Sequence, residues 1–576
     1  MSIPSSNHFL DQLLWKRVLI IWLIVVALVR FINLGFVDLQ GWDEGLFALR
    51  SASIVHFGDW FDQTQYVPGG LATSCYPPLT FWTTAAFYKT LGANEWTTRL
   101  TSALFGAGSV ILIVSLMRRI TSLTASLFGG ILLGTNLFYG FLSRQGQLDV
   151  AYCFFLLLSL HGWVIWSEDR NRRQGLTLVA IGTCGAFMSK ILVGFYIPLI
   201  LVLLEAIDMR KEWRWSRVFT LCSAVCAGVV IALPWHILMY MRYGAAFLDA
   251  FFGLHVLRRV ASPLEGHNPW LGPLFYLNQL FVRYPESGFA VGFFVAVLFN
   301  RATSRISSRM LIIVLTWSAV VSAIITVMAT RLAQYSLPLA IPFALLGGEV
   351  LGLLTSGSLS RKSSVVVLGV FALGALWSSL WPLRAYVKAN IFGMHEVGFP
   401  VPLPWPMLLI AIASACFTFV FILQRSPKNW PLTARFAGIV LLLLFTFRFV
   451  YEVTVNDRTQ YNIGTKDIAA LLRHERAQRV IYLGEDLNPA LDVYLKGWNE
   501  WSTAVTLDFY LSTSTALATK STFVSPPNPG EVTFLVEERR IAADSLFVNA
   551  NALKGDRFPL FSNTAYNVYD VTASTQ

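Results

Sequence analysis

Long apolar segments alternate with short polar ones over the first 453 residues of this 576-residue chain. An α-helix needs about 20 mostly apolar residues to cross a bilayer. Thirteen segments approach or reach this length, at residues 18–34, 97–117, 123–142, 148–166, 176–188, 192–207, 218–239, 288–299, 310–328, 335–354, 365–381, 406–423 and 436–453. The fifth, sixth and eighth are short for a crossing. The pattern predicts a polytopic α-helical membrane protein with about 13 transmembrane helices.

Two of the polar segments between these helices are long, at residues 35–96 and 240–284. Within the first, amphipathic patterns predict helices over 46–57 and 79–91. Long loops in compact proteins are usually either functional or disordered. Both loops are rich in aromatic residues and weakly charged, which argues against disorder. We expect them to be ordered and to carry function.

Beyond residue 453 the composition becomes that of a soluble domain of roughly 120 residues. Periodicity predicts helices over 465–474 and 490–496 and strands over 479–483, 532–537 and 566–571. The chain is therefore expected to have a membrane domain, 1–453, and a small C-terminal α/β domain, 454–576.

The charge distribution predicts which side of the membrane each loop occupies. The chain is 55% hydrophobic and 13% charged, with a formal net charge of +11. Its basic residues gather in alternate short loops, at Arg118 and Arg119, Arg170 to Arg173, Arg210 to Arg217, Arg301 to Arg309, Arg361 and Lys362, and Arg425 to Arg435. Loops rich in Lys and Arg are typical of the cytoplasmic side. The prediction is a cytoplasmic N-terminus, an outer 35–96 loop and an outer C-terminal domain, without nucleic-acid binding.

The N-terminal apolar segment follows Lys16 and Arg17, in the manner of a signal peptide. It is long for a signal sequence, and no small-residue cleavage site follows it. We therefore expect it to be a retained first transmembrane helix.

An acid pair, Asp43 and Glu44, lies where the first apolar segment leaves the bilayer. Carboxylates are costly within a membrane but can be held at its edge, which makes the pair a functional candidate. The alternative is that the two acids only cap the helix that follows.

Other candidates are predicted on the same outer side. They are Arg144, Asp149, Lys190, His255, Arg258, Arg259, His267, Arg331 and Tyr335. Each base alone could be an interfacial anchor whose head reaches water. Together, a carboxylate and several cations suit transfer from a lipid phosphate, in which the acid accepts a proton and the cations stabilise the departing phosphate.

Several common catalytic motifs are missing from the sequence. It has no phosphate-binding loop of the G-x-x-x-x-G-K-[ST] type, no D-x-D pair, and no H-E-x-x-H or G-x-S-x-G motif. Five of the six cysteines lie within apolar segments, which leaves Cys75 alone in a polar loop. ATP-driven transport, nucleotide-sugar chemistry and a cysteine zinc cluster are therefore not expected.

A series of short motifs resembles the GT-C glycosyltransferases, in particular the branch of bacterial lipid A aminoarabinose transferases and protein mannosyltransferase-like enzymes. The motifs are Asp43-Glu44 with Arg50, Gly58-Asp59-Trp60, Pro77-Pro78-Leu79, Glu95-Trp96 with Arg99-Leu100, Asp149, Ser189-Lys190 with Gly194, Pro234-Trp235, Phe251-Phe252 with His255 and Arg258, His267 with Pro269-Trp270, and Arg331 to Pro338. Their order along the chain makes the match more specific than any one of them.

The resemblance implies a membrane enzyme that moves a sugar from a polyprenyl-phosphate donor to a lipid, glycan or protein acceptor, at the outer face of a bacterial inner membrane. It implies that Asp43 is the catalytic base, with Asp149 a second acid near the acceptor and Glu44 the adjacent acid. The implied phosphate-binding cations are Lys190, Arg258, Arg331 and Arg50. His255, His267 and Tyr335 are implied substrate contacts, and the two histidines are also candidate ligands of a divalent metal. No cofactor is otherwise implied.

The chain departs from the aminoarabinose transferase pattern in two places. Cys75 and Tyr76 stand where those enzymes have Glu-Lys, and Leu46 stands where they have Arg. The change at Cys75 and Tyr76 removes a metal-ligand candidate and a phosphate-binding lysine. Both departures argue against aminoarabinose activity and against a zinc site, and they leave the broader interpretation of glycosyl transfer intact.

Two other classes of function remain open on the sequence. One is a secondary transporter or flippase for a lipid-linked or polysaccharide substrate, which would place charges near mid-membrane in broken helices. The other is a non-catalytic protein of surface polysaccharide assembly. The clustering of charges at one membrane edge favours the enzyme.

Overall fold

The structure is a computed structural model, and it describes most of the chain. The described residues are 6–40, 43–64, 66, 70–168, 172–190, 193–209, 213–263, 272–299, 306–390, 405–423, 430–451, 453–454, 464–483, 504–511, 516–518, 527–538, 559–562 and 566–572. The predicted helix over 490–496 and the candidate His267 lie outside them.

Helices make up most of the described residues up to residue 451. In chain order they are α1 Ser6–Leu28, η1 Val29–Phe31, α2 Asp43–Phe57, α3 Leu71–Ser74, α4 Leu79–Leu91, α5 Glu95–Ile120, α6 Leu123–Thr135, α7 Leu137–Leu142, α8 Asp149–Ser167, α9 Arg172–Phe187, η2 Val193–Phe195, α10 Tyr196–Asp208, α11 Trp215–Tyr243, α12 Ala245–Leu248, η3 Asp249–Arg258, α13 Arg259–Ala261, η4 Gly272–Leu274, α14 Phe275–Val282, α15 Ser287–Phe299, α16 Ser308–Val327, η6 Ala333–Leu339, α17 Ala340–Thr355, α18 Arg361–Asn390, α19 Trp405–Leu423 and α20 Trp430–Tyr451.

Among the described residues, seven helices are long and apolar enough to cross a membrane. They include α5, α8, α11, α16, the continuous η6–α17 segment, α18 and α20. Three shorter apolar helices, within α6, α15 and α19, join them in the bundle. The prediction of a polytopic helical membrane protein is confirmed.

The predicted single helix over 123–142 is wrong, because it is two helices that meet at Asn136. This residue has an extended backbone, with φ −61° and ψ 121°, and its side-chain oxygen accepts the Tyr139 N–H at 2.6 Å. Asn competes with the helix for backbone hydrogen bonds and is favoured as an N-cap. A hydropathy pattern does not register such a break within an apolar run.

The antiparallel helices α8 and α9 pack with backbone against backbone. A Cβ added to Gly162 would lie 2.6 Å from the Gly175 carbonyl oxygen, and one added to Gly175 would lie 2.6 Å from the Trp166 amide nitrogen. Small residues allow this close approach in membrane helices. The pair matters for function because α8 begins at Asp149 and α9 ends three residues before Lys190.

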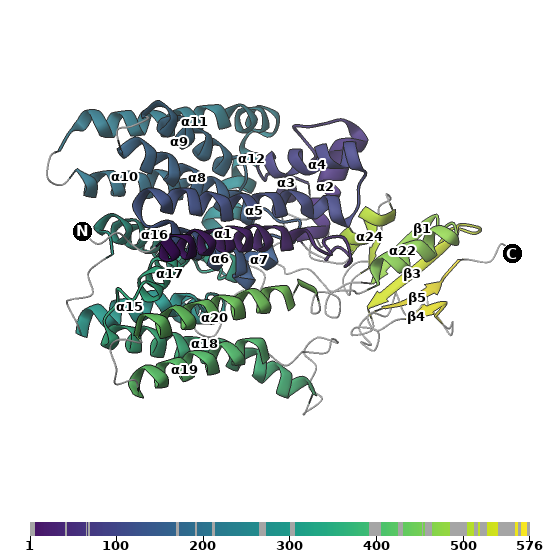
Figure 1. Cartoon of the computed structure of the whole chain (residues 1–576). Coiled ribbons are helices and arrows are strands. Elements are labelled where there is room, and N and C mark those ends of the chain that lie inside the picture. The colour runs from purple at the N-terminus through teal and green to yellow at the C-terminus, as the bar shows by residue number, and fades with distance from the viewer. Residues whose placement is uncertain are drawn as a thin grey trace.

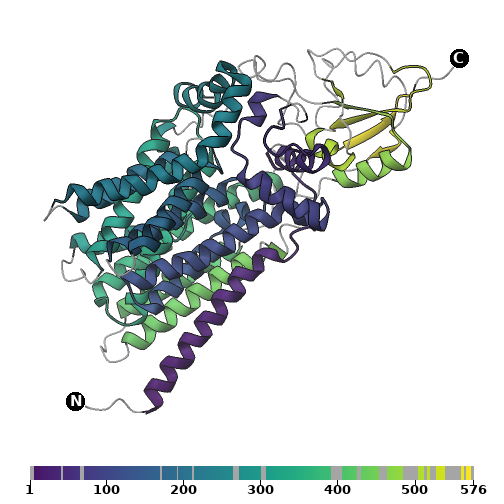
Figure 2. The ribbon, with the colours of Figure 1, turned by 90° about the horizontal axis from the view of Figure 1, so that it is seen from above.

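The predicted amphipathic helices of the first long loop are present as α2 and α4. With α3 they lie at the end of the bundle nearest the C-terminal sheet, far from the N-terminus (Figures 1 and 2). We call this end of the bundle the module end. In both views α1 runs along the bundle toward it.

The C-terminal module, residues 464–572, is a small sheet with helices α22 Thr465–His474 and α24 Ala504–Leu511. Its strands are β1 Arg479–Leu483, β2 Ala516–Ala518, β3 Thr533–Glu538, β4 Phe561–Ser562 and β5 Tyr566–Asp570, in the order β2-β1-β3-β5-β4. β1 pairs in parallel with β2 and β3, whereas β5 is antiparallel to β3 and β4. Four of the five predicted elements of this region are confirmed, nearly to the residue.

Candidate active site

The first element of the site is a buried ion pair between two helix ends. The Lys190 ammonium lies 2.6 Å from Oδ1 of Asp149, and the two side chains are 19% and 6% exposed. Burial alone would lower the pKa of Lys190, but the Asp149 carboxylate, with help from Tyr335 and Asp43, raises it above its usual value. Lys190 therefore stays positively charged at neutral pH.

Aromatic rings surround the Lys190 ammonium. Its nitrogen lies 5.7 Å from the ring centroid of Tyr152 and 6.0 Å from that of Tyr335. Ring faces favour a cation without using its N–H groups. Lys190 thus keeps donors available for a further anion.

A second cation, Arg259, reaches the same site through Tyr335. The Arg259 Nη1 donates to the Tyr335 hydroxyl at 2.9 Å, and the arginine is 8% exposed. Two backbone hydrogen bonds join α13 to the segment before η6, from Ala329 N–H to Val260 O and from Thr330 N–H to Arg259 O. The segment that begins at α13 and the η6 segment are therefore held together beside Lys190.

The neighbouring Arg258, which the motif had selected, is exposed at the end of η3. η3 is a π-helix over ten residues. A π-helix has more residues per turn than an α-helix, so it changes which of two adjacent side chains faces inward. Sequence reasoning named Arg259 as a member of the charged group but did not give it a role in the site.

Asp43 is the first residue of α2 and is partly exposed. Its carboxylate is close enough to Lys190 to help raise the pKa of that ammonium. A carboxylate at a helix N-terminus is stabilised by the unpaired N–H groups there. Asp43 is thus a partly exposed carboxylate within electrostatic range of the Lys190 ammonium.

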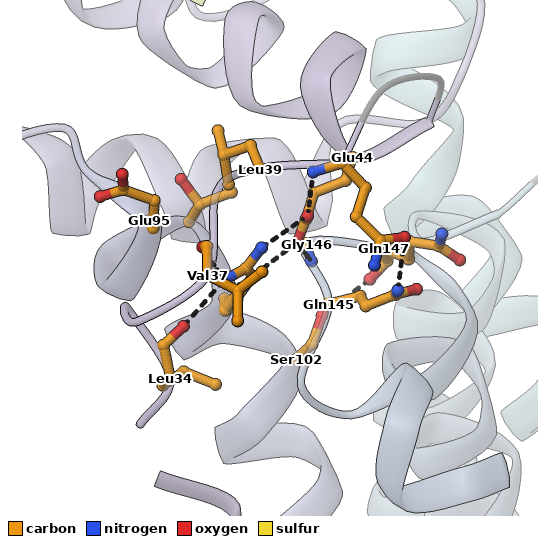
Figure 3. Close-up of polar contacts among 12 residues, drawn as sticks. Leu34, Val37, Leu39, Glu44, Glu95, Ser102, Gln145, Gly146 and Gln147 are labelled. Atoms are coloured by element: carbon orange, nitrogen blue, oxygen red, sulfur yellow. Dashed lines mark hydrogen bonds and ion pairs between the residues drawn. The ribbon is translucent and has the colours of Figure 1, made fainter. Parts of the chain in front are cut away.

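Glu44, in contrast, has both carboxylate oxygens engaged (Figure 3). Oε1 accepts from Arg99 Nε and from the Gly146 N–H, both at 2.8 Å. Oε2 accepts from Arg99 Nη2 at 2.9 Å and from the Gln40 N–H at 2.8 Å. With a residue exposure of 1%, Glu44 is buried within these hydrogen bonds and joins the start of α2 to Arg99 and to the turn at Gly146.

Arg99 extends this network to the segment that leads into α2. Its guanidinium also donates to the carbonyl oxygens of Leu34 at 3.0 Å, Val37 at 2.7 Å and Asp38 at 2.8 Å. We call Arg99, Glu44 and these partners the Arg99 clamp. A Cβ at Gly146 would lie 2.7 Å from a methyl group of Thr98, so only glycine fits where the clamp meets the turn before α8.

Arg50 and His255 are both buried, and both contact Tyr76. The Arg50 guanidinium is fully buried, 4.7 Å from the Phe81 ring centroid and 5.5 Å from that of Tyr76. His255 is 7% exposed, with Nε2 2.8 Å from the Ala72 carbonyl oxygen and Nδ1 3.3 Å from the Tyr76 hydroxyl. Tyr76, at one of the departing positions, therefore connects both residues.

Within the described residues, no group of three or more His, Cys, Asp or Glu side chains could hold a metal ion. Both ring nitrogens of His255 are occupied by the contacts above. The described part of the site therefore does not fit a metal centre.

Arg331 is half-buried before η6, and the neighbouring Leu332 carbonyl accepts from the Tyr276 hydroxyl at 3.4 Å.

The second long loop anchors the first through Asp62. Its Oδ2 accepts from Arg242 at 2.6 Å and from the Tyr243 hydroxyl at 2.8 Å, and its Oδ1 accepts the Thr64 N–H at 3.0 Å. Burial would raise the pKa of Asp62, but these hydrogen bonds outweigh burial and lower it. The sequence carries no local signal for this anchor, because Asp62 and Arg242 are 180 positions apart.

Comparison with known proteins supports a relationship to membrane glycosyltransferases. Residues 76–237 match the dolichyl-phosphate-mannose-protein mannosyltransferase family. An undecaprenyl phosphate-alpha-4-amino-4-deoxy-L-arabinose arabinosyl transferase from Pseudomonas savastanoi pv. phaseolicola is 26% identical over 329 residues, which are 56% of this chain and 59% of that protein. A counterpart from Pseudomonas aeruginosa (strain LESB58) is also 26% identical, over 54% of this chain and 55% of its own length. The matched region thus spans less than two thirds of either relative.

The fold matches a solved structure over nearly the whole chain. ArnT from Cupriavidus metallidurans bound to undecaprenyl phosphate superposes with a TM-score of 0.70 at 18% identity, covering 97% of this chain and 99% of ArnT. Its apo state gives a TM-score of 0.68. The resemblance to GT-C glycosyltransferases is confirmed, and the fold is that of ArnT.

Proposed function

We propose that this chain is a membrane glycosyltransferase that moves a sugar from a polyprenyl-phosphate donor, of the undecaprenyl class, to an acceptor hydroxyl or phosphate on a lipid, glycan or protein. The observation that carries the proposal is the cation site at Lys190 with Arg259 and Tyr335, next to the partly exposed carboxylate of Asp43. The related arabinosyl transferases, which use an undecaprenyl-phosphate-linked sugar by name, add support.

In the proposed reaction, the acceptor oxygen attacks the anomeric carbon of the sugar while Asp43 takes its proton. The bond between that carbon and the phosphate oxygen breaks, and polyprenyl phosphate leaves with the electron pair. Lys190 and Arg259 stabilise the extra negative charge on this leaving group. Attack opposite the leaving group would invert the configuration of the sugar.

The remaining residues are given supporting roles. Asp149 holds Lys190 charged and oriented, through the 2.6 Å contact. Glu44 fixes the start of α2, and Arg50 and His255 support the floor of the site. Arg258, Arg331 and Tyr335 are proposed to form the rim on the donor side, with His267 as a further substrate contact.

We further propose the membrane arrangement that the charge pattern predicts. It has 13 transmembrane helices within 1–453, a cytoplasmic N-terminus, and an extracytoplasmic domain at 454–576. The active site would then lie at the periplasmic face of a bacterial inner membrane. Cysteine labelling from either side, at single cysteines placed at positions 59 and 361 in a cysteine-free chain, tests the orientation.

The central experiment uses the purified full chain in lipid nanodiscs. The donor is the undecaprenyl-phosphate-linked sugar that accumulates in cells lacking this gene, and the acceptor is a lipid and glycan extract of the same cells. We expect release of undecaprenyl phosphate coupled to sugar transfer. Asp43→Asn should reduce turnover by about 10²- to 10⁴-fold, the usual range for loss of a general base.

Asp59→Asn is the matched control, because Asp59 is an acid of the same loop whose Oδ1 accepts the backbone N–H groups of Phe61 and Asp62. Near-normal turnover of Asp43→Asn would remove Asp43 from the proposed role. Movement of the lipid-linked sugar across proteoliposomes without bond formation would instead identify a transporter or flippase.

A further inference from the structure

The C-terminal module contacts the membrane part where the chain leads into α2. Tyr510, on α24, uses its hydroxyl twice: it accepts the Leu39 N–H at 2.9 Å and donates to Oε1 of Glu95 at 3.1 Å. Burial and the Glu95 carboxylate raise the pKa of Tyr510, so the hydroxyl keeps the proton it donates. One hydroxyl therefore joins the module, the loop and the start of α5.

Lys466, on α22, makes a second connection beside the first. Its ammonium lies 2.7 Å from the same Glu95 oxygen, and its backbone N–H donates to Oδ2 of Asp38 at 3.2 Å. The Glu95 side chain is 6% exposed and that of Lys466 is 54% exposed. The Lys466 ammonium thus covers the largely buried Glu95 carboxylate on the side that faces solvent.

An apolar contact supports these polar ones. Phe509 packs with Leu39, Ala48 of α2 and Tyr88 of α4, and Leu39 is fully buried there. The Phe509 and Tyr88 ring centroids are 6.1 Å apart. α24 therefore rests directly on the two helices of the first long loop.

The contact at Leu39 continues into the first turn of α2. The next residue, Gln40, donates its N–H to Glu44 at 2.8 Å and accepts the Gly45 N–H at 3.0 Å. The Arg99 clamp holds the carbonyls of Val37 and Asp38. Residues 37–40 are thus bound by the membrane part through Arg99 and by the module through Tyr510.

We infer that Tyr510 and Lys466 are positioning residues for Asp43, through which the C-terminal module fixes the start of α2. The inference rests on the proposed function only for the catalytic role of Asp43. Rates fall by up to about 100-fold when a reacting group is misplaced by about 1 Å. Loosening residues 38–40 therefore lowers kcat although neither residue belongs to the cation site.

The first test measures the contact itself, by amide hydrogen exchange on the full chain in nanodiscs without substrates. Tyr510→Phe removes the hydroxyl and keeps the ring, so exchange of the Leu39 amide should become about fivefold faster, the value of one typical hydrogen bond. Lys466→Met should give a smaller increase, and Lys466→Arg should restore the wild-type rate. Tyr569→Phe, within β5 of the same module, is the control and should leave Leu39 unchanged.

The second test measures kcat and KM separately with the donor and acceptor extract described above. Tyr510→Phe should lower kcat about tenfold and leave both KM values within twofold of wild type. Arg479→Met, which removes an ion pair with Glu531 inside the module, controls for general loosening and should keep the wild-type kcat.

Each result decides the inference. Faster Leu39 exchange with lower kcat supports it. Unchanged Leu39 exchange overturns it, and so does faster exchange with normal kcat or an equal loss of kcat in Arg479→Met. If the wild-type chain transferred no sugar, the proposed function and the catalytic part of the inference would both fail, while Leu39 exchange would still show whether the module holds the loop.

Discussion

Two buried ion pairs at the module end of the bundle differ in how completely their polar atoms are used. In the Arg99 clamp, both Glu44 oxygens accept two hydrogen bonds each, and the arginine also binds three backbone carbonyls. Lys190 makes one hydrogen bond among the described residues, to Asp149, and is otherwise faced by aromatic rings. A saturated pair has nothing left for a ligand, whereas an unsaturated one has. The extent to which the hydrogen-bonding atoms of an ion pair are already used therefore distinguishes a pair that stabilises the fold from a pair that can bind a ligand.

Breaking the saturated pair of Arg99 and Glu44 should have the strongest consequence, a loss of stability. Arg99→Met would leave Glu44 buried without its partner and free three carbonyls, which should destabilise the protein by about 3–5 kcal/mol. Denaturant unfolding in detergent measures this. Arg119→Met is the matched control, since the side chains of the Arg119–Glu168 pair are 35% and 18% exposed, and a solvent-accessible pair should be worth less than about 1 kcal/mol. Equal stability of the two variants would show that the clamp does not hold the fold.

The unsaturated pair should behave in the opposite way when both members lose their charge. In Asp149→Asn/Lys190→Met no buried charge is left alone, so stability should stay within about 1 kcal/mol of wild type. Sugar transfer should nevertheless fall by about 100- to 1,000-fold, because the leaving phosphate loses a cation. A double variant that unfolds like Arg99→Met, or that transfers sugar normally, contradicts the comparison.

Two adjacent arginines, Arg258 and Arg259, should differ in the same way. Arg259→Met should reduce use of the lipid donor by about 10- to 100-fold, since the residue is buried and hydrogen-bonded to Tyr335. Arg258→Met, on the exposed side, should change it by less than about threefold. Initial rates over a series of donor concentrations separate the two. The reverse ranking would return the phosphate-binding role to Arg258.

The smallest expected effect concerns Asp38, at the border between clamp and module. Burial, with repulsion from Glu95 and Asp467, raises the pKa of Asp38 above its usual value. A raised acid pKa means that module docking is strongest below the ordinary Asp pKa and weakens as pH rises through the raised value. Asp38→Asn keeps an acceptor for the Lys466 N–H, so it should remove this pH dependence and slow Leu39 exchange at neutral pH by less than about threefold. The measurement is the exchange rate of the Leu39 amide, corrected for the intrinsic effect of pH on exchange. If Asp38→Asn left the pH profile of this rate unchanged, Asp38 would not be the source of the pH dependence.

The sequence predicted those parts of the molecule that depend on local periodicity. The helix at 465–474 and the strand at 479–483 have the predicted bounds, because each pattern follows one buried face. The break at Asn136 escaped, since its side chain caps a helix inside an apolar run. Hydropathy averages over such single residues.

The sequence predicted which residues belong to the site but not which of them pair with each other. Asp43, Asp149 and Lys190 were named, and the structure brings Lys190 together with Asp149 and within the field of Asp43. The family resemblance favoured Asp43 over Glu44, but no local pattern indicated that Glu44 pairs with Arg99, which lies 55 residues away. The choice of Arg259 over Arg258 depends on a π-helix whose register no apolar pattern encodes. Contacts between distant residues and unusual helix geometry account for most of the difference.

The glycine contact between α8 and α9 sets a limit on how the cation site can respond to its ligand. Because Gly162 and Gly175 bring the two backbones together, the helices meet through backbone atoms at these positions and have little room to shift there. Asp149 and Lys190 sit at the ends of this rigid antiparallel pair. In the proposed reaction, negative charge moves onto a phosphate whose surrounding dipoles are already in place, so little reorganisation energy is spent. Bulkier residues at this crossing would then lower the rate without touching a charged group.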